Sequence, residues 1–402
     1  MTPVEDPNRH LSYLQQCLAG DKKPLGLFLG AGCPMAVPSA GTAGPLIPDV
    51  AGITKMVQGG LADSEPCKGI LKKVEEHFRE DGCADATVED MLTHIRALRA
   101  VAGKGEVRGL SAGGLEMLDQ SICAFIQKVA DKSLPNAQTP YHQVAAWVDG
   151  IGREKPVEIF TSNYDLLMEQ AFEECGVPYF DGFAGARKPR FDLRAMEEDV
   201  LPARWARLWK LHGSINWYQT PNGGVFRGTT TEQNAPRRVI HPSYLKYQEG
   251  RRLPYLAMID RLRAFLKQPT AALVICGYSF RDEHINEVIA QGLQSTQTAM
   301  TFGLLHGRLS EYPAAVALAT GRANLSLLAR DGAIVSAREA RWPEKNKDAV
   351  SEGTSIGVVW KLCEAANESG NRVAEFTLGD FAVLGQFLRD LAGNARLSPG
   401  AA

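Results

Sequence analysis

The feature that most constrains the fold is the segment Leu25 to Cys33, in which an apolar run ends in a glycine-rich turn. Leu25 to Leu29 contains only leucine, phenylalanine and glycine, as expected of a strand covered on both faces of a parallel sheet. The following Gly30, Ala31 and Gly32 predict a tight turn, and such a turn at the carboxyl end of a parallel strand offers N–H groups to a diphosphate. A purely structural turn fits this segment alone equally well.

Three further strand candidates, of which the one before His212 is only half apolar, end in polar clusters in the same way. Residues 157–161 precede Asn163 and Asp165, residues 207–211 precede His212, and residues 271–276 precede Gly277 and Ser279. Because ligands of open α/β sheets bind at the carboxyl ends of the strands, these polar residues are candidates for one site. Structural roles are the alternative, since Asn163 or Asp165 can cap a helix and a lone histidine is more often structural.

Segments of helical periodicity alternate with these strands. The spacing predicts helices at 10–19, 67–78, 88–101, 115–129, 141–148, 166–175, 254–266 and 283–293. This order predicts an α/β fold with a Rossmann-like, mostly parallel sheet and a helical insertion at about residues 49–150. Residues 217–219, 224–227 and 238–241 predict a short antiparallel excursion. Residues 1–340 are expected to form one domain, and residues 341–402 a C-terminal appendage that packs on the same domain.

The segment 34–48 is rich in proline, glycine, serine and alanine, which predicts a long loop without regular structure. Long loops inside compact domains are commonly functional. Because this loop begins at the glycine turn, it is either a lid over the ligand or an irregular surface segment.

The composition of the 402-residue chain, with 45% hydrophobic residues and a formal net charge of -2, excludes an overall attraction to nucleic acid. Short basic segments such as 187–190 are typical of solvated loops, so no direct nucleic-acid binding is expected. No apolar run approaches the roughly 20 residues of a membrane helix, and the polar N-terminus has no signal-peptide core. We therefore expect a cytoplasmic protein with no membrane contact. The eight cysteines form no Cys-x-x-Cys pair, which predicts neither a zinc site nor a disulfide framework.

In their order and spacing over residues 25 to about 330, the polar clusters resemble the sirtuin superfamily. The glycine turn is similar to the family's NAD-binding glycine motif, Asn163-Tyr164-Asp165 to its Thr-Gln-Asn-Ile-Asp motif, His212-Gly213 to its catalytic His-Gly, and Ile47-Pro48-Asp49 to its cofactor loop. The resemblance implies that residues 1–340 are a sirtuin-like NAD-binding domain.

Two differences from the sirtuin deacylases indicate which members of the superfamily this chain resembles. Sirtuin deacylases carry a zinc module of two Cys-x-x-Cys pairs after the histidine, whereas this chain has no cysteine between Cys175 and Cys276. The Asn-Tyr-Asp form and the segment 277–282 (Gly-Tyr-Ser-Phe-Arg-Asp) resemble instead the sirtuin-like proteins of bacterial anti-phage defence, which hydrolyse NAD. A chain of this size resembles those paired with a HerA-like hexameric ATPase. The resemblance implies a zinc-free NAD hydrolase (NADase) of antiviral defence, forming a homo-oligomer.

The resemblance also implies residue roles. Asn163 would position the attacking water and the ribose hydroxyls, Asp165 would bind the nicotinamide carboxamide, and His212, with an ordinary pKa of about 6.5, would be the general base. The backbone N–H groups of residues 31–33 would bind the phosphates. The residues expected to bind the cofactor are Gly30, Ala31, Gly32, Cys33, Asp49, Asp165, Gly277 and Ser279. Two other functions remain open: an NAD-dependent protein deacylase or ADP-ribosyl transferase, and a nucleotide-sensing subunit of an ATPase complex.

Overall fold

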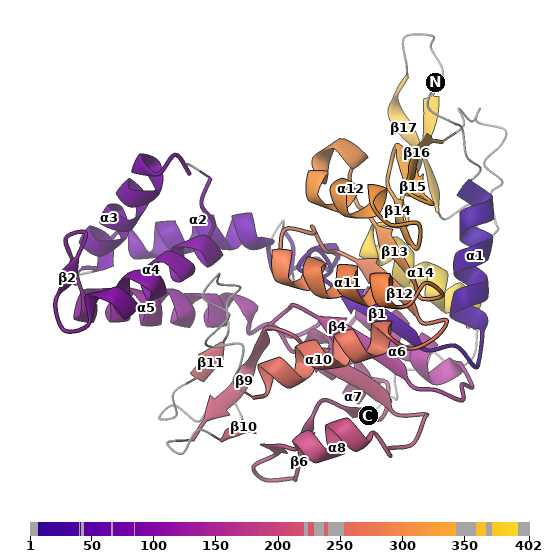
Figure 1. The fold of residues 1–402 in the computed structure, drawn as a ribbon, viewed down its shortest axis with the longest axis horizontal. Coiled ribbons are helices and arrows are strands. Elements are labelled where there is room, and N and C mark those ends of the chain that lie inside the picture. The colour runs from indigo at the N-terminus through magenta and orange to yellow at the C-terminus, as the bar shows by residue number, and fades with distance from the viewer. Residues whose placement is uncertain are drawn as a thin grey trace.

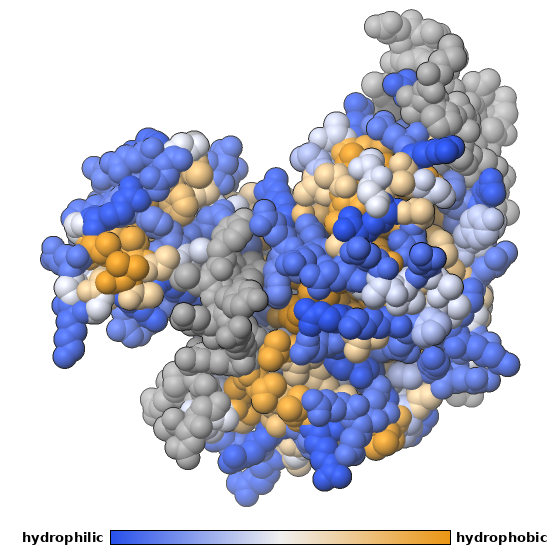
Figure 2. Space-filling model, viewed as in Figure 1, coloured by the Kyte–Doolittle hydropathy of each residue, from blue (hydrophilic) through white to orange (hydrophobic). Residues whose placement is uncertain are grey.

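The computed structural model describes residues 7–39, 41, 44–65, 67–83, 85–220, 224–228, 237–239, 253–342, 359–366 and 372–392. Its main body is a nine-stranded sheet covered by helices, and a separate group of helices stands to one side, drawn in purple (Figure 1). Most of the face shown in Figure 2 is hydrophilic, with apolar side chains gathered on that helical group and beside helix α10 (Tyr255–Leu266). In the described part of the chain no helix is long and apolar enough to cross a membrane.

The centre of the main sheet is β1 (Leu25–Leu29), which pairs in parallel with β12 (Ala272–Cys276) on one side and β4 (Val157–Thr161) on the other. The full order is β16 (Arg338–Arg341), β15 (Gly332–Val335), β14 (Leu325–Leu328), β13 (Met300–Leu304), β12, β1, β4, β8 (Ala206–Lys210) and β5 (Tyr179–Phe180). Among the described strands of this sheet, the antiparallel pairings are β14–β15 and β15–β16, so β15 runs opposite to the other strands. The predicted α/β fold of Rossmann type, with a mostly parallel sheet, is therefore confirmed.

The apolar sequence of β1 is explained by burial on both faces of the sheet. Leu25, Leu27 and Leu29 belong to one hydrophobic cluster and Phe28 to another, as the alternation of side chains along a strand requires. The first cluster is covered by α1 (Pro7–Ala19), α6 (Pro140–Gly150), α7 (Leu167–Glu174) and α14 (Phe381–Leu391). The second is covered by α10, α11 (Glu283–Ser295) and α12 (Pro313–Thr320).

The helical insertion forms a hydrophobic cluster of its own. It consists of α2 (Val50–Leu61), α3 (Cys67–Glu80), α4 (Val88–Ala102) and α5 (Ala112–Ala130), with a hairpin of β2 (Glu106–Val107) and β3 (Leu110–Ser111). Helix α5 begins three residues before the predicted start, because the Ser111 hydroxyl caps it by accepting from the Gly114 N–H at 3.1 Å. The hairpin lies in the glycine-rich segment between α4 and α5.

A second, antiparallel sheet follows the main one. Its order is β11 (Arg237–Val239), β9 (Gly213–Gln219), β10 (Val225–Arg227), β7 (Arg190–Phe191) and β6 (Phe183–Ala184). The predicted antiparallel excursion is confirmed, although residues 240–241 of one predicted strand lie outside the described residues. The shorter elements are α8 (Leu193–Glu198), the 3-10 turns Pro34–Ala36 and Leu309–Glu311, and the hairpin of β17 (Trp360–Ala366) and β18 (Arg372–Phe376).

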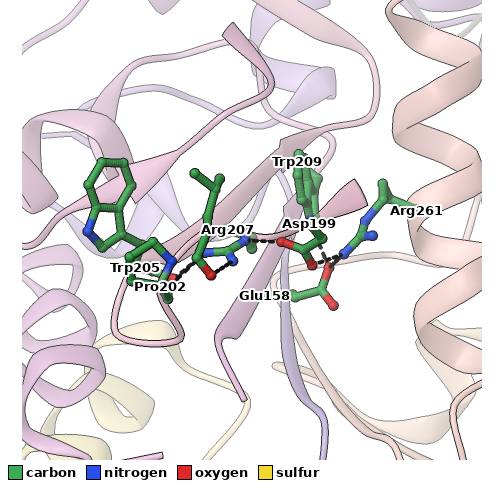
Figure 3. Close-up of polar contacts among 8 residues, drawn as sticks. Glu158, Asp199, Pro202, Trp205, Arg207, Trp209 and Arg261 are labelled. Atoms are coloured by element: carbon green, nitrogen blue, oxygen red, sulfur yellow. Dashed lines mark hydrogen bonds and ion pairs between the residues drawn. The ribbon is translucent and has the colours of Figure 1, made fainter. Parts of the chain in front are cut away.

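A buried ion network joins β4, β8 and α10 (Figure 3). Glu158 accepts hydrogen bonds from Trp209 Nε1 at 2.7 Å and Arg261 Nη2 at 3.0 Å. Asp199 accepts from the same Arg261 nitrogen at 3.0 Å and from Arg207 Nε at 2.7 Å. Two arginines thus balance two carboxylates. Because Glu158 and Arg207 are the second residues of their strands, this network lies toward the amino ends and stabilises the packing of α10 on the sheet.

Candidate active site

The candidate site is built from the turns that follow β1, β4, β8 and β12 at the carboxyl edge of the main sheet. The turns after β1 and β12 pack directly on each other. Gly30 N donates to Cys276 O at 2.9 Å, and Gly32 N donates to Gly277 O at 2.8 Å. The first and the last of the predicted polar clusters are therefore joined through their backbones.

The glycines of these turns are required by the contact between the two backbones. A Cβ on Gly30 would lie 2.3 Å from Gly277 O, and one on Gly32 would lie 2.9 Å from Gly277 Cα. Gly277 itself has a φ of +68°, and a Cβ there would lie 2.7 Å from Cys33 N. The predicted tight turn is present, and its glycines permit close approach of one turn to the other.

The same packing uses two of the three N–H groups that were expected to bind phosphate. Gly32 N donates to Gly277, and Cys33 N donates to Gly30 O at 3.0 Å. The Cys33 side chain is completely buried, and burial raises the pKa of its thiol well above the ordinary value. In this conformation the N–H groups of Gly32 and Cys33 have acceptors within the turns, and phosphate binding by Ala31, Gly32 and Cys33 stays a prediction.

Asn163 ties the turn after β4 to the turn after β1. Its Nδ2 donates to Gly30 O at 3.1 Å, and its backbone N donates to Thr161 Oγ1 at 3.0 Å. The Thr161 hydroxyl in turn donates to Leu29 O at 2.7 Å. Asn163 is only 9% exposed, so its amide is held firmly at the sheet edge. This position is compatible with the role implied for it, next to the glycine turn.

Asp165 is a buried carboxylate at the start of α7. Its Oδ1 accepts from Leu167 N at 3.0 Å, so the helix-capping alternative is part of its role. Burial raises the pKa of Asp165 to about 6, although the nearby Lys210 ammonium acts in the opposite direction. Lys210 is itself buried and donates to the main-chain oxygen of Asp165 and, at 2.8 Å, to Glu169 Oε1. An unusually basic carboxylate at a sheet edge is a candidate functional group.

His212 lies in the turn between β8 and β9 and is paired with Asp282. Its Nε2 is 2.9 Å from Asp282 Oδ2, and the two side chains are 6% and 10% exposed. The other oxygen of Asp282 accepts from the N–H groups of His284 at 3.0 Å and Ile285 at 3.1 Å, which fixes the carboxylate at the start of α11. A carboxylate at Nε2 selects the tautomer that carries its proton there, which leaves the basic lone pair on Nδ1.

Sequence reasoning did not single out Asp282 as the partner of His212. The residue ends the polar cluster 277–282, immediately before a helix, so the signal in the sequence was only that of an N-cap. Sequence reasoning also missed Asn286, which lies in α11, one turn after Asp282. Asn286 Nδ2 donates to Phe280 O at 2.6 Å, and its Oδ1 lies 2.9 Å from the Tyr278 hydroxyl. These contacts hold the loop in which Phe280 has a φ of +57°.

Two of the predicted cofactor-binding residues lie on the surface. Ser279 is exposed within the 277–282 loop. Asp49 is also exposed and caps α2, where its Oδ1 accepts from Gly52 N at 2.8 Å. Among the described residues, this hydrogen bond connects the Asp49 side chain to the start of α2 and not to the buried residues of the site. A role for Asp49 and Ser279 in binding stays a prediction.

A mostly parallel sheet with polar residues at neighbouring carboxyl ends defines a Rossmann-type α/β protein with a strand-end site. Within that class, residues 157–315 match the SIR2-like domain family. The matched segment includes Asn163, Asp165, His212 and Asp282 and begins after the glycine turn.

The chain is also similar to a solved structure reported as "Structural Basis for the Mechanism and Regulation of Sir2 Enzymes". The similarity covers 75% of this chain and 86% of that chain, with 14% identity and a TM-score of 0.34. No curated protein matches the chain. Among the residues that the structure describes, no group of three or more His, Cys, Asp or Glu side chains is arranged to hold a metal ion.

Proposed function

We propose that this protein is an NAD⁺ hydrolase that cleaves the nicotinamide–ribose bond to give nicotinamide and ADP-ribose. The observation that supports the proposal most is the buried His212–Asp282 pair, at 2.9 Å, at the sheet edge that also carries Asn163. Both members of the pair, and Asn163, lie within the segment that matches the SIR2-like domain. SIR2-like proteins are enzymes that act on NAD⁺, and a base, an amide and a buried carboxylate are the groups that such a cleavage needs.

Departure of nicotinamide leaves positive charge on the ribose, so the site must stabilise that charge and deliver a nucleophile to C1 of the sugar. In the proposed mechanism Asn163 orients the water and the ribose hydroxyls. His212 accepts the proton of the water at Nδ1 while Asp282 stabilises the imidazolium that forms. Asp165 accepts a hydrogen bond from the carboxamide of the leaving group, and Ala31 donates its N–H to the diphosphate.

Hydrolysis is preferred over protein deacylation because the chain has no Cys-x-x-Cys pair and no cysteine between Cys175 and Cys276. Deacylation and ADP-ribosyl transfer both require an acceptor other than water, whereas the proposed reaction requires NAD and water alone. A nucleotide-sensing subunit would have no use for a paired histidine at the sheet edge.

The test of these roles is NAD loss in purified wild type, Asn163→Ala and His212→Ala. We expect both variants to retain the circular dichroism spectrum of the wild type and to lose NAD consumption by a factor of 10² or more. Turnover that persists in both folded variants would refute the assignment. Lys155→Ala is the control, because this exposed residue lies just before β4, at the end of the strand opposite the site, and it should keep wild-type activity.

We also propose a cytoplasmic, homo-oligomeric effector of anti-phage defence that works with a HerA-like ATPase. The support is the similarity of Asn163-Tyr164-Asp165 and of the segment 277–282 to defence sirtuins. Residues 1–340 would be the sirtuin-like domain and residues 341–402 the appendage, in which α14 packs against α6. Light scattering of the purified chain, alone and mixed with a HerA-like ATPase, tests both assemblies. A monomer that ignores the ATPase would contradict this part of the proposal.

A further inference from the structure

Tyr164 is the residue of the candidate site that reaches the helical insertion. It lies between Asn163 and Asp165 in the chain, at the carboxyl edge of the main sheet. Its side chain packs against the hydrophobic cluster of the insertion, and its hydroxyl oxygen is buried. The loop that carries two candidate site residues is therefore anchored, through one aromatic ring, in helices that belong to a separate hydrophobic core.

The backbone of Tyr164 is attached to the loop that carries His212. Its carbonyl oxygen accepts from Ile215 N at 3.0 Å and lies 3.4 Å from Ser214 Oγ. Ile215 and Ser214 belong to β9, which begins directly after His212. The ring and the carbonyl of one residue thus connect the insertion, the Asn163 loop and the His212 turn.

Charges from the insertion and from the site surround the same phenol. Burial raises the pKa of Tyr164 well above the ordinary value, the carboxylates of Glu89 and Asp282 act in the same direction, and Arg96 acts against them. Glu89 and Arg96 are on α4 of the insertion, whereas Asp282 is the partner of His212. The ring therefore stands where the insertion faces the His212–Asp282 pair.

We propose that Tyr164 is a positioning residue through which the helical insertion sets the placement of the Asn163–Asp165 loop. When the insertion is firmly packed, the ring holds the loop against β9. When the insertion is loosened or shifted, the loop loses that support and Asn163 leaves its place on the glycine turn. Only the consequence for turnover rests on the proposed function; the coupling itself is a property of the fold.

Amide hydrogen exchange of the protein without NAD tests the coupling independently of any activity. Tyr164→Phe keeps the ring, and we expect exchange at residues 161–167 and 213–216 to stay within about twofold of the wild type. Tyr164→Ala removes the ring, and we expect exchange in both segments to rise about tenfold or more. A folded Tyr164→Ala protein with unchanged exchange in these segments would overturn the proposal.

A second pair of variants tests the coupling from the side of the insertion and does not alter Tyr164. Leu92 in α4 and Leu327 in β14 are both completely buried, so truncation to alanine leaves cavities of similar size in different clusters. Leu92→Ala should raise exchange at residues 161–167 about tenfold, and Leu327→Ala should leave it within twofold. Equal exchange in the two variants would overturn the proposal.

If the protein hydrolyses NAD, a turnover assay adds the functional readout. Tyr164→Ala and Leu92→Ala should lower kcat/KM about tenfold, and Tyr164→Phe should restore it. Altered exchange with no turnover even in the wild type would reject the proposed function and leave the coupling intact. Unaltered exchange with normal turnover would reject the coupling alone.

Discussion

The side-chain amide of Asn163 donates a hydrogen bond of 3.1 Å to the carbonyl oxygen of Gly30. Through it, the candidate catalytic amide and the glycine turn become one unit, although they are far apart in the sequence. Gly30 in turn packs on Gly277, which opens the loop that ends at Asp282. The relative placement of these groups is therefore fixed by one side-chain hydrogen bond and by backbone packing at the carboxyl ends of β1, β4 and β12.

The Asn163–Gly30 hydrogen bond predicts that Asn163→Asp destabilises the protein, although the two side chains are nearly equal in size. The substitution replaces an N–H donor with a carboxylate oxygen that faces a carbonyl oxygen in a buried position. We expect a loss of about 1–3 kcal/mol in the free energy of unfolding, measured by urea denaturation at pH 7. Ser279→Asp, on the exposed loop, is the control and should cost almost nothing. Equal stability of the two variants would contradict the role of the bond.

The buried carboxylate of Asp165 is expected to lower the stability of the protein while it contributes to the proposed activity. Its pKa is raised from 3.8 to about 6 in the folded protein, so folding favours the protonated form. The contribution of Asp165 to the free energy of unfolding is fully present below pH 4 and is lost as the pH rises through 6. At pH 8 the free energy of unfolding is lower by about 3 kcal/mol for this reason. Asn at this position keeps the acceptor for Leu167 N and carries no charge.

We therefore expect Asp165→Asn to unfold at a higher urea concentration than the wild type at pH 8 and to match it at pH 4. The same variant should lose NAD turnover, because an amide does not offer the carboxamide the same charged acceptor. If the difference in the free energy of unfolding between the two proteins were the same at pH 4 and pH 8, the buried charge of Asp165 would not be its cause.

The His212–Asp282 pair predicts that Asp282→Asn lowers turnover about 10²-fold or more while the fold is kept. Asparagine retains an oxygen for the N–H groups of α11 but no longer selects the tautomer of His212. Asp282→Ala should lose about 1 kcal/mol of stability in addition, because the helix cap is lost. Wild-type kcat in Asp282→Asn would show that the pair is structural.

The contact between the two glycine turns predicts that Gly30→Ala is strongly destabilising. A methyl group there would lie 2.3 Å from a backbone oxygen, and backbone cannot move aside as a flexible side chain can. We expect a loss of about 2 kcal/mol or more, measured as a fall in the thermal midpoint. Gly44→Ala is the matched control, because a Cβ at Gly44 meets nothing within 4 Å. Equal midpoints for the two variants would contradict this explanation of the glycine.

Much of the fold followed from the sequence, because strand burial on both faces gives a continuous apolar run such as Leu25 to Leu29. The polar residues after each run could be assigned to one edge of the sheet for the same reason. The hairpin at residues 106–111 and the two-residue strands β6 and β7 could not be predicted, since elements this short have no periodicity. Their pairing depends on tertiary contacts.

The site was less predictable than the fold. His212 was identified from its place after a strand, but its partner Asp282 looked like an ordinary helix cap. The contact of Tyr164 with the insertion depends on the tertiary packing of two hydrophobic cores, and the local sequence pattern does not predict such packing. The hydrogen bonds of Gly32 N and Cys33 N were not foreseen, because their acceptors, Gly277 O and Gly30 O, are set by the packing of the turns.

The most direct test of the proposed hydrolysis is the product balance of NAD incubated with the purified chain, with and without a HerA-like ATPase, resolved by liquid chromatography and mass spectrometry. We expect nicotinamide and ADP-ribose in equal amounts, formed without any acylated peptide or acceptor protein and absent with His212→Ala. Intact NAD in both incubations, or nicotinamide release only when an acyl-lysine peptide is added, would contradict it.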